Sequence, residues 1–321
     1  MTRLATLLAA LLAAPSLAHT YDEPWHEQVA AGAAALARVE VLEVGRREVR
    51  VKTERLLAGA ELPAELTVAI PGTDDHPHPV LLAARERYYL FLWRTEDGGW
   101  SLPTPTAGFA HERPDGLIQA TYRHSYHQGL VPRELYEETQ AAIFRARHGE
   151  PAPAALVARL ADELLAKPPD GLPDDPTDEA NLFFRQHAAL ETVFHLGWGE
   201  VPPERALALL EPFLQSDVWH VQVSAVRALE RVPGREARTR MMRFLRARGR
   251  SGFAQVMAVW ALRRANARGL REELQRLAGE ASDEEVGFGG SIMDPRVGTR
   301  FPRSVKDALE ELVAEWAEEG R

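Results

Sequence analysis

The 321-residue chain contains no cysteine, and this absence excludes several structures and chemistries. Without thiols there is no disulfide, no thiolate nucleophile and no zinc site built on cysteine. An excess of positive charge is also missing, because the formal net charge is −9 at pH 7. We therefore expect no nucleic-acid partner, and a fold that core packing alone holds together.

Long apolar runs are missing after the first residues, so we expect no membrane span in the mature chain. The run at the start, Leu4 to Ala14, is shorter than the ~20 residues that cross a bilayer. It follows Arg3, and Ser16-Leu17-Ala18 places small residues where signal peptidase cleaves. Residues 1–18 are therefore predicted to be a cleavable signal peptide, which leaves His19 as the first residue of a periplasmic or secreted protein. The alternative for this segment is a buried N-terminal helix.

The signatures of common catalytic sites are missing too. The chain has no Gly-x-Ser-x-Gly elbow and no His-Glu-x-x-His helix, because His26-Glu27 and His111-Glu112 lack a second histidine. Gly287-Phe-Gly-Gly290 does not have the spacing of a phosphate-binding loop, and no Gly-Lys-Ser/Thr is present. The sequence predicts neither an enzyme nor a nucleotide cofactor.

What is present in the first half is a period of two, which is typical of β-strands. Alternating runs begin at Ala37 and Val49, and turn signals such as Asp97-Gly98-Gly99 separate later runs. Residues Tyr88 to Trp93 are apolar on both faces, which indicates a central buried strand. Five or six short strands with regular turns predict a small closed antiparallel barrel.

Three segments resemble the OB-type barrel of netrin-like and tissue-inhibitor-of-metalloproteinase modules: Leu57-Ala58-Gly59, Leu66 to Ile70 and Arg87 to Leu92. The resemblance covers about a third of the chain and implies an OB-like barrel, which we place with a terminal helix at residues 19–150. In the metalloproteinase inhibitors the mature N-terminal residue chelates the zinc of the target. The resemblance therefore gives that role to His19.

The second half contains an internal repeat. Residues 151–180 are expected to hold one helix and a Pro/Asp-rich linker. Beyond them, Val223-Ser-Ala-Val-Arg-Ala-Leu229 recurs as Val256 to Leu262 at an offset of 33 residues, and the same step back gives Leu190 to Leu196. Each copy is predicted to begin a helix that a turn and a second helix follow.

This repeat resembles HEAT repeats in the spacing of its small residues, Ala225, Ala228, Ala258 and Ala261. The resemblance implies a protein-binding solenoid over residues 181–321, with an inserted loop at 281–303. Each helix pair then buries its apolar face only against the next pair, which leaves a long surface for a partner. The predicted fold class is multidomain α+β, with a small antiparallel OB-like β-barrel followed by an α-helical HEAT-like solenoid.

Two features of the second half are candidate partner-binding sites. One predicted helix carries arginines opposite its apolar face, at Arg235, Arg238, Arg240, Arg243 and Arg246. They suit a carboxylate- or phosphate-bearing partner, and the alternative is a solvated face paired with nearby glutamates. The inserted loop carries the apolar residues Phe288 and Met293, and it is either a partner contact or a disordered insert.

Histidines gather in the first half and form the candidate metal site. A mature N-terminal His19 offers an α-amine beside an imidazole, which chelates copper or zinc. Further nitrogen ligands are available from His76-Pro-His78 and His124-x-x-His127. The alternative is that these are loop and surface histidines that hold no metal.

The sequence favours an exported, non-catalytic binding protein that recognises another protein or an anionic envelope component through its helical repeat surface. One alternative is a metal-binding or protease-inhibitor-like module centred on His19. Another is a maturation factor for a specific exported enzyme. The oligomeric state does not follow from the sequence.

Overall fold

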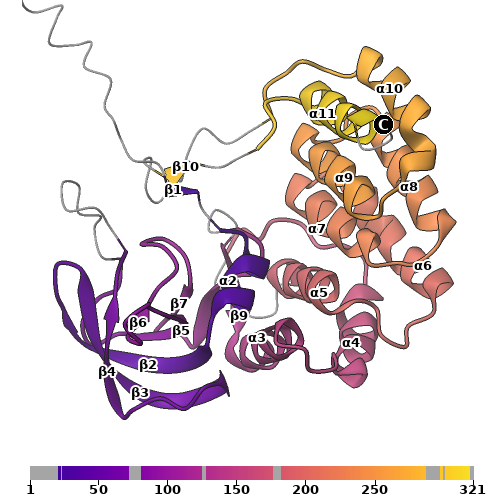
Figure 1. Ribbon diagram of the computed structural model, residues 1–321. Helices are drawn as coiled ribbons and strands as arrows, with labels where there is room; N and C mark the ends of the chain where they lie inside the picture. Colours follow the sequence, from indigo (N-terminus) through magenta and orange to yellow (C-terminus); the bar gives the residue numbers. More distant parts are fainter. Residues whose placement is uncertain are drawn as a thin grey trace, which may run out of the picture.

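The computed structural model describes residues 21–22, 24–71, 81–124, 128–175, 182–286, 297–298 and 301–318, and shows a mixed α+β protein (Figure 1). Strands occupy most of the first half of the chain and helices occupy the second half. None of the helices in the described ranges has both the length and the apolarity that crossing a bilayer requires.

Five strands close into a barrel, as the sequence predicts. They are β2 (Ala35–Val44), β3 (Glu48–Gly59), β4 (Glu65–Ala69), β5 (Arg87–Arg94) and β6 (Trp100–Ser101). Their order is β2-β3-β4-β6-β5, and a further pairing of β2 with β5 closes the ring. This is the strand order of an OB-type barrel. One detail of the prediction is wrong, because β4 and β6 run parallel in a barrel that was expected to be antiparallel throughout.

The period-two pattern decides which side chains fill the barrel. Leu90 and Leu92 of β5 point into it and belong to one core cluster. Their neighbours Tyr89 and Phe91 lie on the other face and belong to a second cluster, which continues into the helices. The central strand is thus buried on both faces, as predicted.

Three further strands extend the sheet from β5 and lead into the helices. They are β7 (Phe109–Glu112), β8 (Leu117–Thr121) and β9 (Gln128–Pro132), each antiparallel to the one before it. The chain passes from β9 directly into α3 (Arg133–Arg147), against which α2 (His26–Gly32) packs. The short strand β1 (Tyr21–Asp22) pairs in parallel with β10 (Val297–Gly298), so the start of the described chain lies beside the inserted loop.

The helices of the second half pack in sequence order. One side of the assembly holds α5 (Leu182–Leu196), α7 (Trp219–Glu230), α9 (Gly252–Arg264) and α11 (Val305–Glu318), each in contact with the next (Figure 1). The other side holds α4 (Ala154–Leu160), which continues as a π-helix over Ala161–Leu165, then α6 (Pro203–Leu214), α8 (Arg235–Arg246) and α10 (Arg271–Glu280).

The hydrophobic core continues from the barrel into these helices. Helix α5 packs on α3 and on β9, and one core cluster runs from Val29 to Trp316. The expected linker is tied to the helices, because the Gln186 side chain donates hydrogen bonds to the carbonyls of Leu164 and Pro168. Packing is thus continuous from the barrel through this segment into the helices.

The small residues of the repeat are buried where α7 and α9 meet. Ala225, Ala228, Ala258 and Ala261 are all fully buried. We expect Ala258→Leu to destabilise the protein by about 1–3 kcal/mol, because a well-packed helix interface has no room for the added methyl groups. Urea unfolding followed by circular dichroism measures the change. Ala314→Leu on the exposed face of α11 is the control, and an equal effect of the two substitutions would contradict the packing argument.

Candidate functional site

The predicted arginine stripe lies on α8, with the apolar face of that helix turned inward. Ala237, Met241, Phe244 and Leu245 are buried, as the helical pattern predicts. The arginines lie at positions that are partly or fully exposed. Gly234 has a φ of +104°, a conformation that glycine adopts without strain, and it begins the helix directly after a turn. Figure 1 shows α8 between α6 and α10 on one side of the helical half.

Acidic neighbours neutralise two of the five arginines. Arg240 donates to Glu211 at 2.5 Å and to Glu236 at 3.3 Å, and Arg246 pairs with Glu273. Arg235, Arg238 and Arg243 make no ion pair in the part of the chain that the structure describes. Pairing with nearby glutamates thus accounts for Arg240 and Arg246. Arg235, Arg238 and Arg243 are the arginines of the stripe that are left for an acidic partner.

Arg243 also borders a small hollow between α6 and α8, beside Arg240, Phe244 and Arg250. The hollow has a volume of about 30 Å³. Arg250 is held there by Gln215 and lies 5.6 Å above the centre of the Phe244 ring. The arrangement can receive one carboxylate or phosphate oxygen at a time, which is the recognition chemistry that arginine performs best.

The other predicted site residues are not brought together in the described structure. His19, His76, His78 and His127 lie outside the described residues, as do Phe288 and Met293 of the inserted loop. His124 is buried after β8, with its ring edge-on to Trp25 at 5.3 Å between ring centres. No set of three or more histidine, aspartate or glutamate side chains in the described ranges is placed to hold a metal ion.

The structure contains a buried charge cluster that the sequence analysis missed. Glu191 on α5 is fully buried, and it accepts a hydrogen bond of 2.8 Å from Arg227 on α7. The Nε atom of Arg123, in the segment after β8, lies 3.4 Å from the same carboxylate. Arg227 also reaches Glu27 on α2 at 3.3 Å. The cluster thus joins the barrel side of the molecule to two repeat helices.

A serine and a histidine complete this cluster, but their connections differ from those of a catalytic triad. The Ser224 hydroxyl donates to Glu191 at 2.8 Å, and its oxygen lies 3.0 Å from Nδ1 of His187. Because the serine proton points at the carboxylate, His187 donates to the serine and cannot act as its base. Ser224 is also fully buried. These contacts fix the positions of charged groups in the core, and the Ser224 hydroxyl is not accessible to a substrate.

The charge state of the cluster follows from its surroundings. Burial alone raises the pKa of Glu191, but Arg227 and Arg123 reverse this and bring the pKa to about 2. Burial, with a smaller contribution from the nearby Arg123, lowers the pKa of His187 to about 3. Burial also lowers the pKa of Arg123 to about 10. At neutral pH the cluster therefore holds charged arginines and carboxylates around a neutral imidazole.

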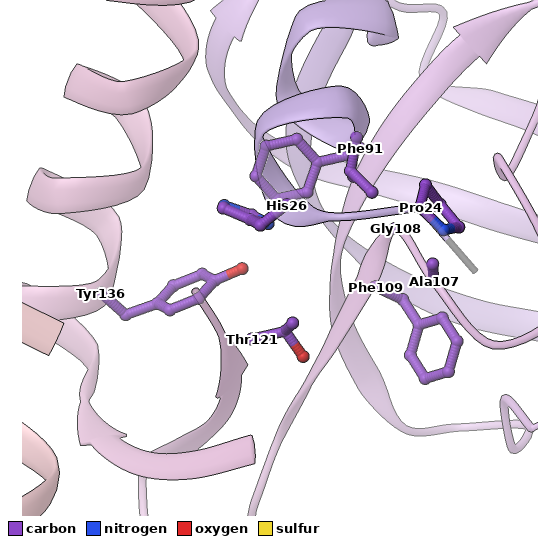
Figure 2. Close-up of a pocket in the computed structure, with 9 residues that line it drawn as sticks. Pro24, His26, Phe91, Ala107, Gly108, Phe109, Thr121 and Tyr136 are labelled. Atoms are coloured by element: carbon purple, nitrogen blue, oxygen red, sulfur yellow. The ribbon is translucent and has the colours of Figure 1, made fainter. Parts of the chain in front are cut away.

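A second buried histidine, His26, borders a cavity between α2, β5 and α3. Figure 2 shows His26, Phe91 and Tyr136 around this space. The cavity has a volume of about 10 Å³, which leaves room for about one water molecule. Nε2 of His26 lies 2.7 Å from Oε1 of Gln140, and burial lowers the pKa of His26 to about 4. The cavity is too small for a substrate.

Comparison with known proteins adds no functional assignment: no family model, no curated protein and no solved structure matches this sequence. The HEAT-like and netrin-like resemblances both remain predictions.

Proposed function

We propose that the chain is an exported, non-catalytic binding protein whose helical half is a HEAT-like solenoid that recognises an acidic partner protein. The single observation that carries this proposal is the group of Arg235, Arg238 and Arg243 on α8, which are partly or fully exposed and make no ion pair in the described structure, in a chain of net charge −9. Export is supported by the N-terminal pattern of Arg3, the apolar run and Ser16-Leu17-Ala18.

Charge complementarity supports an acidic partner for this surface. Several arginines elsewhere in the described structure already pair with a glutamate or aspartate of the same chain, as Arg159 does with Glu138 and Arg205 with Asp162. An acidic partner replaces water around the α8 cations without breaking an existing ion pair. The attraction steers encounter and weakens as salt is added.

We expect Arg235→Glu/Arg243→Glu to reduce capture of the partner by roughly tenfold or more, because like charges then face each other. The experiment is a pull-down from periplasmic extract with tagged full-length protein, with partners quantified by mass spectrometry. The matched control is Arg46→Glu/Lys52→Glu, which reverses two cations of the barrel and changes the net charge equally. Arg240 is left intact because it already binds Glu211.

Equal capture by the two double variants would end the proposal for α8. Recovery of a lipid or polysaccharide in place of a protein would keep the surface but assign it to an anionic envelope component. A partner that binds as well in high salt as in low salt would also contradict recognition through these arginines.

A further inference from the structure

A second surface, on the barrel side of the molecule, has the form of a peptide-binding trough. Strand β3 pairs with β2 along its whole length, from Val49 to Gly59, but with β4 only over Glu48–Lys52. The Thr53 N–H still donates to the Ala64 carbonyl, and beyond Thr53 this edge of β3 has no strand beside it in the described part of the sheet. An exposed strand edge is normally shielded, because its N–H and C=O groups are ready to pair with another chain.

The unpaired edge lies in a concave surface. It borders a trough of about 800 Å³ whose other walls are α3 and the start of α4. This volume is within the range of about 300–1,000 Å³ that ligand sites occupy in proteins. The edge is flanked by α3 and α4 on this side, and the trough between them is open to an extended segment.

The floor of the trough is apolar, and an irregularity in β3 exposes part of it. The register between β2 and β3 shifts twice near this point, which is the mark of β-bulges. The alternation of buried and exposed residues breaks there, so Leu56 is turned outward and is 36% exposed. Leu57, Ala142 and Leu156 line the floor beside it and are buried. An apolar side chain of a bound segment can therefore pack on Leu56.

Most polar groups of the trough are already held in place. Glu137 accepts hydrogen bonds of 2.7 Å from Arg55 and from the Tyr89 hydroxyl. Arg145 donates to the Leu57 carbonyl at 3.2 Å. Among the residues that line the trough, Glu134 is exposed and makes no ion pair in the described structure. The walls are thus preorganised, with one carboxylate left for a ligand cation.

We propose that this trough binds an extended peptide segment of another protein, which adds to the free edge of β3 as a strand and places a lysine or arginine against Glu134. Main-chain pairing supplies affinity, and the apolar floor together with Glu134 supplies selectivity. The surface is separate from the α8 arginines and does not depend on their role. It favours a basic ligand, whereas α8 favours an acidic one.

The test starts from a display library of random short peptides, panned on the immobilised full-length protein. We expect the enriched peptides to alternate apolar residues with at least one lysine or arginine. Labelled copies should then bind in fluorescence anisotropy, and Leu56→Asp should weaken binding roughly tenfold or more, which corresponds to about 1.4 kcal/mol. Glu134→Arg should weaken the binding of the basic peptides to a similar extent. Leu172→Asp is the matched control, because Leu172 is a leucine that is 63% exposed outside the trough.

Hydrogen exchange of the complex locates the bound peptide. Saturation with peptide should slow the exchange of those amides between Glu54 and Gly59 that face the open edge, because strand addition pairs them. Failure to enrich peptides, equal binding by Leu56→Asp and Leu172→Asp, or protection confined to another part of the chain would each overturn the proposal. Thermal melting of the variants confirms that each is folded, which is expected because both leucines are exposed.

Discussion

Replacing Glu191 with alanine should cost about 3–5 kcal/mol of unfolding free energy, because it removes a carboxylate that two buried arginines share. Arg227 and Arg123 are both fully buried, and Glu191 lies between them in the interior. Without it, Arg227 keeps only Glu27 as a carboxylate partner and Arg123 keeps none in the described structure, in a medium that solvates charge poorly. Urea unfolding, followed by tryptophan fluorescence at neutral pH, measures the loss.

The control for this prediction is Glu285→Ala. Glu285 pairs with Arg303 at 3.1 Å, but both side chains are more than 70% exposed. Water replaces the lost partner there, so we expect a change of less than about 1 kcal/mol. Similar losses for the two substitutions would show that the buried cluster has no special role in holding the fold.

The two arginines should differ as well, because their partners differ. Arg227 donates to Glu191 and Glu27, and its guanidinium lies 3.7 Å above the ring of Phe194. The three nitrogen atoms of Arg123 have no hydrogen-bond partner in the described structure. Arg227→Met should therefore destabilise the protein more than Arg123→Met, which removes a buried charge that is only weakly satisfied.

The repeat pattern contained a signal for this cluster. At the offset of 33 residues, Glu191 aligns with Ser224, and Phe194 aligns with Arg227. A glutamate and an arginine thus occupy positions of the helix where the pattern otherwise places apolar or small residues. A charge at an inward position implies a buried partner. It does not name that partner, because Glu27 and Arg227 are 200 residues apart and only the tertiary fold joins them.

Some elements of the fold were likewise predictable from the sequence, and others were not. Strands β2, β3 and β4 of the barrel show alternation over five or more residues, and the helices show turn residues at their ends, so these elements were expected from sequence. Strand β7 is only four residues long, and β9 ends at a proline, so neither carries enough alternation to be seen. The parallel pairing of β4 with β6 depends on how the sheet closes, which local patterns do not encode.

Mild acid should destabilise the protein strongly, because histidines that are neutral in the fold become charged on unfolding. Burial lowers the pKa of His26 and His220 to about 4, and that of His187 and His195 to about 3. The pKa of an unfolded histidine is about 6.5. Each of these groups therefore contributes stability that is fully present above pH 6.5 and is lost as the pH falls from 6.5 toward the folded pKa of that group, about 4 for His26 and His220 and about 3 for His187 and His195.

The surroundings of these histidines explain why the folded state resists protonation. Arg147 donates to Nδ1 of His195 at 3.1 Å, so Nε2–H of this ring donates to the Tyr122 carbonyl at 2.9 Å. Both nitrogens are used in the neutral form, and a proton on Nδ1 would face a guanidinium. His26, Glu27 and Arg227 also act on this ring. Around His187 the charged and titratable neighbours are Arg123, Glu191, His220 and Arg227.

We expect the unfolding free energy to fall by about 2 kcal/mol for each such histidine between about pH 7.5 and pH 5, since each pH unit below 6.5 corresponds to about 1.4 kcal/mol. Urea unfolding at a series of pH values gives the slope of the unfolding free energy against pH. This slope is proportional to the number of protons that the protein takes up on unfolding. His187→Gln and His195→Gln should each lower the slope by about one proton. Protonation of Glu191 does not contribute to the slope in this range, because its pKa of about 2 means that the carboxylate is protonated only at lower pH. A flat profile down to pH 5 would show that these imidazoles reach solvent in the folded protein, and that the junction between the barrel and the helices is open rather than sealed.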